Sequence, residues 1–149
     1  MKIGITNDHA GTELKSQVIN YLETQGHEVF DCGVNKEVAS DYPVEAQKLC
    51  KEILNKNVEL GIAICGTGVG MSIACNRNKG IRACCCSDAK TAQLARQHNN
   101  SNVLCIGSRI LPDLITVIKI IDTFIDADFS NEERHIRRIR ELDNENKML

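Results

Sequence analysis

Short apolar runs alternate with helix-period segments along the whole chain, and this alternation is the feature that most constrains its fold. A continuously apolar run such as Ile62–Cys65 fits a strand in a sheet that is covered on both faces. Strands that alternate with helices predict a parallel sheet joined by right-handed crossovers. The predicted strands are Lys2–Thr6, Glu28–Cys32, Leu60–Cys65, Ile81–Cys86 and Val103–Gly107.

The segments between the strands carry the periodicity and the end signals of helices. Gly26 ends the first helix, and Pro43 suits the first turn of the second. The predicted helices are Thr12–Gln25, 41–54, a third after the glycines at 66–70, Asp88–Gln97 and Pro112–Ile125. Together these elements predict an α/β fold, a single-domain three-layer αβα sandwich with a doubly wound, Rossmann-like five-stranded parallel sheet.

The end of the chain departs from this pattern. Residues 130–133 form a capping-box sequence, with Ser130 predicted at the N-cap and Glu133 three residues later. A strongly basic helix, Arg134–Arg140, is predicted behind it. Because one doubly wound layer does not need this helix, we expect residues 130–149 to form a C-terminal helical arm of the single domain 1–149 that packs on a partner subunit.

Composition narrows the class of protein. The chain has 149 residues, 42% of them apolar, and a formal net charge of −2. This size fits one globular domain, and the near-neutral charge argues against a nucleic-acid binder. The polar residues Thr6–Asp8 interrupt any signal-peptide core, and no apolar run approaches the length of a membrane span. We therefore expect a cytoplasmic protein that binds neither nucleic acid nor membrane.

Eight cysteines allow three interpretations: a disulfide framework, a metal site or reduced thiols. No C-x-x-C pair occurs, which disfavours structural zinc and a thioredoxin-type redox pair. The predicted cytoplasmic location disfavours disulfides. Most of the thiols, including Cys84, Cys85 and Cys86 in the fourth strand, are therefore expected to be small buried core residues, and no metal site is predicted.

The most informative segment is the glycine loop Cys65–Gly70, which connects the third strand to a helix. Its backbone amides and the helix N-terminus would suit a phosphate or an oxyanion formed during reaction. It lacks the lysine of a Walker A loop and the spacing of a dinucleotide fingerprint. Cys65 meets amide dipoles at the strand end, a setting that favours a reactive thiolate; a buried core cysteine is the alternative.

Polar residues at the ends of other elements extend the candidate site. Asp8 and His9 follow the first strand, at the edge where open α/β sheets bind ligands. The alternative is that Asp8 only caps the turn. His98 and Asn99 end the fourth helix, where a histidine often does no more than complement the helix dipole.

Arginines supply candidate phosphate ligands. Arg109 follows the fifth strand, and Arg134 and Arg138 share one face of the last helix at i, i+4 spacing. Like charges at this spacing repel weakly, so the pair suits an anion between them; a solvated basic face is the alternative. Three convergent arginines would suit bidentate phosphate binding.

As a set, these residues resemble the family of type B ribose-5-phosphate isomerases, which also holds galactose-6-phosphate isomerase subunits. The matching segments lie in order between residues 2 and about 142 and comprise Asp8–Gly11 with Lys15, Asp41–Pro43, Cys65–Gly70, Gly80–Ala83, His98–Asn99 with 102–104, Gly107–Arg109, and Arg134–His135 with Arg138. The resemblance implies no metal and no organic cofactor. It also implies a homodimer or dimer of dimers whose active sites are shared between chains.

The resemblance further implies a role for each residue. Cys65 would be the base that moves a proton between C1 and C2 of the sugar through a cis-enediolate. The loop amides with Thr67 would stabilise the developing oxyanion, and His98 would assist opening of the furanose ring. Asp8 and Asn99 would hold substrate oxygens, and the phosphate would contact His9 and the arginines. The implied substrate-binding set is Asp8, His9, Tyr42, Gly66, Gly68, Val69, Gly70, Asn99, Arg109, Arg134 and Arg138.

Two features distinguish this chain within the family pattern. One branch lacks the loop cysteine and uses a glutamate six residues later, where this chain has Met71, so the chain resembles the cysteine branch. The family commonly has glycines before the Arg134–His135 pair, where this chain has Glu132 and Glu133. The backbone route into the last helix is therefore expected to differ.

These observations predict a sugar-phosphate isomerase that interconverts D-ribose 5-phosphate and D-ribulose 5-phosphate, a step of the pentose phosphate pathway. An isomerase of a six-carbon phosphate, such as allose 6-phosphate or galactose 6-phosphate, is the nearest alternative, because pocket depth decides between them. A non-catalytic phosphate-binding module would bind ligand without exchanging substrate protons with solvent. A thiol redox protein would need a reactive pair of cysteines.

Overall fold

The computed structural model describes residues 1–36 and 38–144. Within these ranges, strands and helices alternate as the sequence predicts, and a short 3-10 helix, His9–Gly11, precedes the first α-helix. The elements are β1 (Lys2–Asn7), α1 (Thr12–Thr24), β2 (Glu28–Asp31), α2 (Tyr42–Leu54), β3 (Leu60–Cys65), α3 (Val69–Cys75), β4 (Ala83–Cys85), α4 (Ala89–Asn99), β5 (Val103–Gly107), α5 (Leu114–Asp126) and α6 (Glu133–Asp143).

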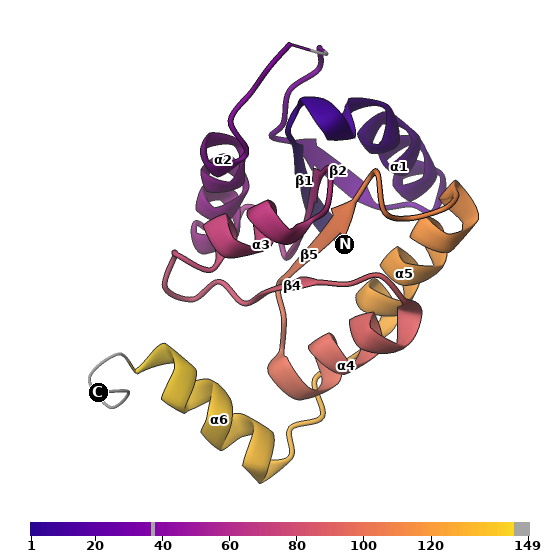
Figure 1. The fold of residues 1–149 in the computed structure, drawn as a ribbon. Coiled ribbons are helices and arrows are strands. Elements are labelled where there is room, and N and C mark those ends of the chain that lie inside the picture. The colour runs from indigo at the N-terminus through magenta and orange to yellow at the C-terminus, as the bar shows by residue number, and fades with distance from the viewer. Residues whose placement is uncertain (37, 145–149) are drawn as a thin grey trace.

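The strands form one parallel five-stranded sheet in the order β2-β1-β3-β5-β4. Helices α2 and α3 cover one face of this sheet, and α1, α4 and α5 cover the other (Figure 1). The predicted three-layer, doubly wound αβα fold is therefore confirmed. Because all strands run the same way, the residues that follow β1, β3 and β5 meet at one edge of the sheet.

Two apolar cores hold the layers together, and β3 contributes to both because successive side chains point to opposite faces. Ile62 and Ile64 pack with α1, α4 and α5, while Ala63 and Cys65 pack with α2 and α3. Every residue of β3 is buried, as its continuously apolar sequence predicts. The side chain of Cys65 thus leaves the sheet towards α3, the helix that follows the glycine loop.

Side chains at the helix ends explain where the helices begin and stop. Asp88 and Asp113 occupy the N-caps of α4 and α5, and each carboxylate accepts a 2.7 Å hydrogen bond from a backbone amide three residues later. Asn100 ends α4 in the left-handed conformation, with φ +45°. Pro43 lies in the first turn of α2, as predicted.

The prediction that Cys84, Cys85 and Cys86 are all core residues is wrong for Cys85, which is exposed. Strand β4 has three residues in place of the expected six, and it lies at the edge of the sheet. The Cys85 thiol therefore has no covering layer and lies near the glycine loop, 3.6 Å from the Thr67 carbonyl oxygen. All eight thiols are free.

The predicted capping box is also wrong. Helix α6 begins at Glu133 with Glu132 at the N-cap, and no side chain caps it. The Ser130 hydroxyl instead accepts a 3.2 Å hydrogen bond from the Glu132 amide and lies 2.6 Å from Nδ1 of His135. Ser130 is unavailable as a cap because its hydroxyl is already engaged by the buried His135 ring.

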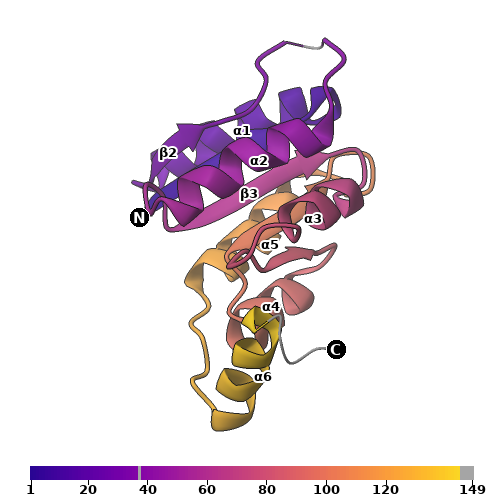
Figure 2. The same cartoon turned by 90° about the vertical axis from the view of Figure 1, so that its left-hand side faces the viewer.

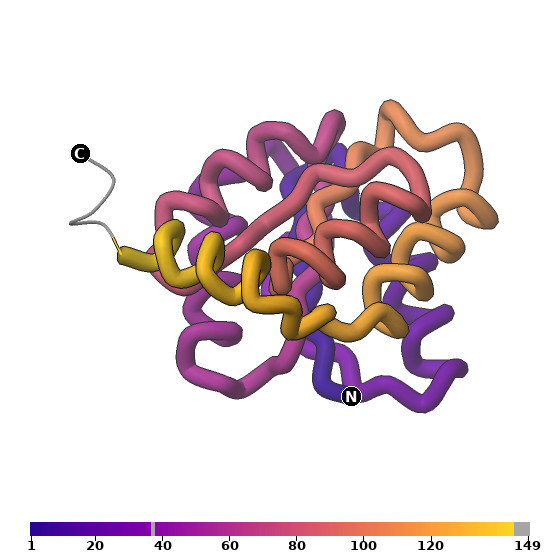
Figure 3. The backbone as a smooth tube through the Cα atoms, turned by 90° about the horizontal axis from the view of Figure 1, so that it is seen from below, coloured from indigo at the N-terminus to yellow at the C-terminus, as the bar shows by residue number. Residues whose placement is uncertain are grey.

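Helix α6 lies outside the αβα sandwich, next to α4 (Figures 2 and 3). The Ser130 amide donates to the Gln97 carbonyl near the end of α4, and Arg82, just before β4, pairs with Asp143 at 3.4 Å. Both anchors lie near the amino ends of the strands. The predicted arm continues to residue 149, and its last five residues lie outside the described ranges. None of the helices in residues 1–36 and 38–144 has the length and apolar character that crossing a membrane requires.

Candidate active site

The carboxyl edge of the sheet gathers one set of predicted site residues, here called the Cys65 group: Asp8, His9, Tyr42, the glycine loop Cys65–Gly70 and Arg109. Parallel pairing sets the ends of β1, β3 and β5 side by side. Backbone hydrogen bonds then join the loops that follow, because the Ser108 amide donates to the Cys65 carbonyl at 2.9 Å and the Arg109 amide to the Gly66 carbonyl at 3.0 Å.

The Cys65 thiol lies at the centre of this group. Its side chain is buried, and its sulfur accepts a 3.1 Å hydrogen bond from the backbone amide of Gly68. This amide is available because Gly68 adopts φ +81°, a conformation that favours glycine and turns the loop back over the sulfur. An amide directed at sulfur stabilises the thiolate, the form of cysteine that acts as a base or nucleophile.

Two further glycines allow side chains to approach the loop. A Cβ at Gly66 would lie 3.1 Å from a guanidinium nitrogen of Arg109, and a Cβ at Gly70 would lie 3.0 Å from the Tyr42 ring. Arg109 and Tyr42 are thus in close contact with the loop backbone. The loop that carries Cys65 is therefore bordered by a cation and by an aromatic ring.

Asp8 and His9 form the neighbouring wall of the Cys65 group. The Asp8 carboxylate accepts a 2.9 Å hydrogen bond from the Ala10 amide, so it caps the turn as the simpler interpretation predicts. The His9 amide donates to the Ser40 hydroxyl at 2.9 Å, and the Ser40 amide donates to Nδ1 of His9 at 3.3 Å. Because Nδ1 accepts this bond, the proton of the ring lies on Nε2, which can donate to a ligand oxygen.

Lys15 stabilises the segment that leads to Ser40, the contact of His9. Lys15 is 1% exposed, and its ammonium donates to Asp31 at 2.9 Å and to the Val34 carbonyl and the Asn35 side chain at 2.7 Å each. These bonds anchor the start of the segment that ends at Ser40. Sequence analysis identified Lys15 only as part of a matching segment, because the charge gave no indication of burial.

The remaining predicted residues, here called the His98 group, lie elsewhere: His98, Asn99, Arg134 and Arg138. Helix α4 runs back from the carboxyl edge, so His98 and Asn99 lie near the start of β5. The arginines are on α6, which the contacts with Gln97 and Arg82 hold at that same amino edge. Arg109 therefore does not converge with Arg134 and Arg138 within one chain.

The His98 group contains contacts that sequence analysis missed. The rings of His98 and His135 stack with centroids 4.3 Å apart, and His135 is buried. Arg134 pairs with Glu132 at 2.8 Å, on the exposed side of the helix. No local signal indicated the stack, because the two histidines lie on different helices.

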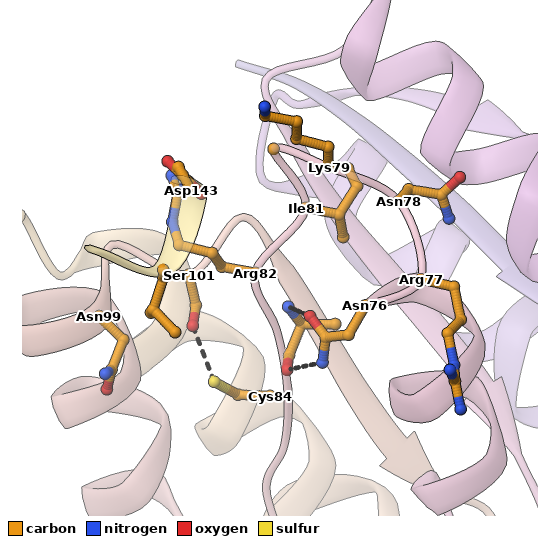
Figure 4. A pocket seen from close by; sticks show the side chains of 13 residues that line it. Asn76, Arg77, Asn78, Lys79, Ile81, Arg82, Cys84, Asn99, Ser101 and Asp143 are labelled. Carbon is orange, nitrogen blue, oxygen red and sulfur yellow. Dashed lines mark hydrogen bonds and ion pairs between the residues drawn. The ribbon is translucent and has the colours of Figure 1, made fainter. Parts of the chain in front are cut away.

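A cavity of about 470 Å³ borders the His98 group (Figure 4). Asn99 and Ser101 line it from the α4 side, Arg82 and Asp143 close one wall, and Leu142 contributes an apolar contact from α6. The cavity lining contains no residue of the glycine loop. Across the described part of the chain, no cluster of three or more His, Cys, Asp or Glu side chains is arranged to hold a metal ion.

Burial disfavours the thiolate form of three other cysteines of the fold. Desolvation raises the pKa of Cys32 to about 11 and that of Cys86 to about 12, so both remain protonated at neutral pH. Burial, with smaller effects from Cys65 and Cys84, also raises the pKa of Cys85. None of these three thiols is a good candidate for a base.

Comparison with known proteins identifies the family. The family model described as Ribose/Galactose Isomerase matches residues 3–142. The chain belongs to this family. The predictions of the family and of an isomerase enzyme are therefore confirmed.

Relatives of this family match the chain over nearly its full length. Ribose-5-phosphate isomerase B of Escherichia coli is 40% identical over 95% of this chain and 93% of its own. A structure titled ribose 5-phosphate isomerase from Thermotoga maritima is 47% identical, with a TM-score of 0.92 over 95% of this chain and 97% of that one. The Clostridium thermocellum ribose-5-phosphate isomerase B structure is 38% identical, with a TM-score of 0.93 over 96% and 95%.

Proposed function

We propose that this isomerase interconverts D-ribose 5-phosphate and D-ribulose 5-phosphate by Cys65-mediated proton transfer. The observation that carries the proposal is the buried Cys65 thiol 3.1 Å from the Gly68 amide, in a loop bordered by Arg109. The names of the relatives support the five-carbon substrate. The free thiols support a reducing, cytoplasmic location.

The reaction begins from the open-chain aldose. The Cys65 thiolate takes the proton from C2, the C–H electron pair forms the C1–C2 double bond of a cis-enediolate, and negative charge develops on O1. The proton on O2 then moves to O1, and the proton held by Cys65 is delivered to C1, which yields the ketone at C2, the hydroxyl at C1 and the thiolate again. The loop amides and Thr67 stabilise the charge on oxygen, because fixed dipoles need little reorganisation.

The other residues bind and prepare the substrate. His98 assists furanose ring opening, while Asp8, Asn99, Tyr42 and the backbone of Val69 contact the sugar. His9, Arg109, Arg134 and Arg138 bind the phosphate. These roles require the His98 group to reach the Cys65 group, although the two groups lie at opposite edges of the sheet in one chain.

The partner in this proposal is a second copy of the chain, with the His98 group of each copy completing the Cys65 group of the other. An apolar surface next to the glycine loop supports it: Val69 and Ile73, one turn apart on α3, are 52% and 54% exposed. Leu142, beside the cavity on α6, is 51% exposed. A symmetric dimer would cover these apolar side chains on both of its chains.

Mixing two inactive variants tests the shared site. Cys65→Ala and His98→Asn proteins are each assayed alone and after refolding together. With shared sites, half of the dimers are mixed and each holds one intact site, so about one quarter of the wild-type activity returns. If each chain holds a complete site, the activity of the mixture equals the average of the activities of the two variants.

A substrate comparison tests the reaction itself. Turnover is measured with ribose 5-phosphate, allose 6-phosphate and galactose 6-phosphate, and proton exchange is followed by NMR in D₂O. We expect the five-carbon substrate to have the highest kcat/KM. Cys65→Ala should abolish proton exchange and leave phosphate binding largely intact. Cys32 lies beside edge strand β2, so Cys32→Ala should retain both proton exchange and phosphate binding. Turnover by Cys65→Ala would refute the assignment of the base, and binding without exchange in wild type would indicate a phosphate-binding module.

A further inference from the structure

His135 is a buried histidine that the proposed reaction does not use. It lies on α6, is 3% exposed, and stacks on His98 of α4 with ring centroids 4.3 Å apart and planes tilted by 31°. His98 itself is only half-buried. The His98 ring therefore packs against a buried ring on one side, and its exposed part can contact a ligand.

A short network fixes the His135 ring to the end of α4. Its Nδ1 lies 2.6 Å from the Ser130 hydroxyl, and this hydroxyl also accepts the Glu132 amide. The Ser130 amide donates to the Gln97 carbonyl, one residue before His98, at 3.0 Å. The same serine thus holds both the supporting ring and the backbone next to the supported ring.

The surroundings of His135 keep it uncharged. Burial, followed by the neighbouring charges of His98 and Arg134, lowers the pKa of His135. Arg138 acts in the same direction, and Glu132 opposes it. A neutral His135 places no positive charge against the His98 ring that it contacts.

We infer that His135, held by Ser130, is a positioning residue that sets the orientation of the His98 ring for furanose ring opening. This inference rests on the proposed function and extends it to a residue that does not touch the substrate. A ring held by stacking occupies one rotamer, and misplacement of a catalytic group by about 1 Å can cost roughly 100-fold in rate.

Two apolar replacements separate stacking from simple space filling. His135→Phe keeps a flat ring, whereas His135→Leu fills a similar volume without one, and both lose the bond to Ser130. Ser130→Ala is a milder variant that leaves the ring in place and releases its anchor. Folding and oligomeric state are checked for each by circular dichroism and sedimentation.

The readout compares a cyclic with an acyclic substrate. Ribose 5-phosphate closes into a furanose, whereas ribulose 5-phosphate stays open because its O5 is esterified. We expect His135→Leu to lose roughly 10- to 100-fold in turnover of ribose 5-phosphate, the range of a misplaced acid–base group. Its proton exchange with ribulose 5-phosphate should fall less than about 3-fold, because that step needs no ring opening. His135→Phe should stay within about 3-fold of wild type in both assays, and Ser130→Ala should fall between the two.

Other outcomes overturn the inference. Equal losses with both substrates would mean that His135 only anchors α6, and wild-type rates in His135→Leu would mean that the stack has no role. The ¹⁵N shifts of the His98 ring are recorded in the same variants. They should change in His135→Leu and not in His135→Phe, which tests positioning even if wild type fails to turn over ribose 5-phosphate and the proposed function is wrong.

Discussion

Replacing Gly68 by alanine tests whether the glycine loop needs a residue without a side chain at its turn. Gly68 has φ +81°, and an added Cβ would lie 2.9 Å from the Cys85 sulfur and 3.0 Å from the Ile106 carbonyl carbon. The left-handed conformation costs a residue with a Cβ about 1–2 kcal/mol. Overpacking against backbone that cannot rotate away adds about 1–3 kcal/mol.

Gly26 supplies a matched control for this substitution. It has φ +86°, and an added Cβ would meet nothing within 4 Å. Gly26→Ala therefore incurs only the conformational cost of about 1–2 kcal/mol. We expect urea unfolding to show a larger loss of stability for Gly68→Ala than for Gly26→Ala. The difference between the two losses in unfolding free energy measures the cost of the steric contacts that a Cβ would make at Gly68.

The same pair of variants links the loop backbone to activity. A shift at Gly68 would move its amide away from the Cys65 sulfur and from the oxyanion that we propose forms on the substrate. Loss of one such donor typically costs about 100- to 1,000-fold in kcat. Turnover of ribose 5-phosphate should fall by that amount in Gly68→Ala and remain unchanged in Gly26→Ala. Equal stability losses in the two variants, with full turnover in both, would refute the reasoning.

Two further predictions follow from buried charged and titratable groups. Lys15→Met should lower the free energy of unfolding by about 2–3 kcal/mol, because partly buried acceptors lose their donor, and KM should rise as the Ser40 contact with His9 loosens. Lys48→Met, which breaks a bond from a half-exposed ammonium, should cost less than about 1 kcal/mol. The lowered pKa of His135 means that the unfolded chain binds the proton more readily than the folded chain does. The contribution of His135 to the stability of the fold is therefore fully present above pH 6.5 and is lost as the pH drops below it. Between pH 7.5 and 5.5, the Tm of His135→Phe should fall less than the Tm of wild type. An equal fall in Tm for both proteins would contradict the lowered pKa of His135.

Local sequence patterns predicted the framework of the fold because its strands are short, buried and regularly spaced. Val103–Gly107 has the predicted bounds, and Lys2–Asn7 extends the prediction by one residue. The fourth strand is shorter than predicted because the Arg82 amide bonds to the Asn102 side chain at 2.8 Å in place of a neighbouring strand. A hydrogen bond between residues 20 positions apart leaves no trace in hydrophobic periodicity.

The candidate site was predictable where it depends on strand ends and glycines. Cys65, Asp8 and Arg109 follow adjacent parallel strands, so their meeting at one edge follows from the order of elements. The interpretation of Ser130 as a cap failed because its hydroxyl contacts His135, five residues later, whose ring in turn rests on His98. Capping statistics describe the backbone amides that a serine usually caps, and they do not include a buried histidine of the same helix that engages the hydroxyl instead.

The sequence by itself determined the βα alternation, the position of the thiol at a strand end and the glycines that bend the loop over it. These follow from side-chain periodicity and from backbone conformations that favour glycine. Only the tertiary structure decided that Lys15 is buried, that Cys85 is exposed and that His98 lies on the far edge of the sheet from Cys65. The reason is that burial and proximity depend on how distant elements pack, which no segment specifies alone.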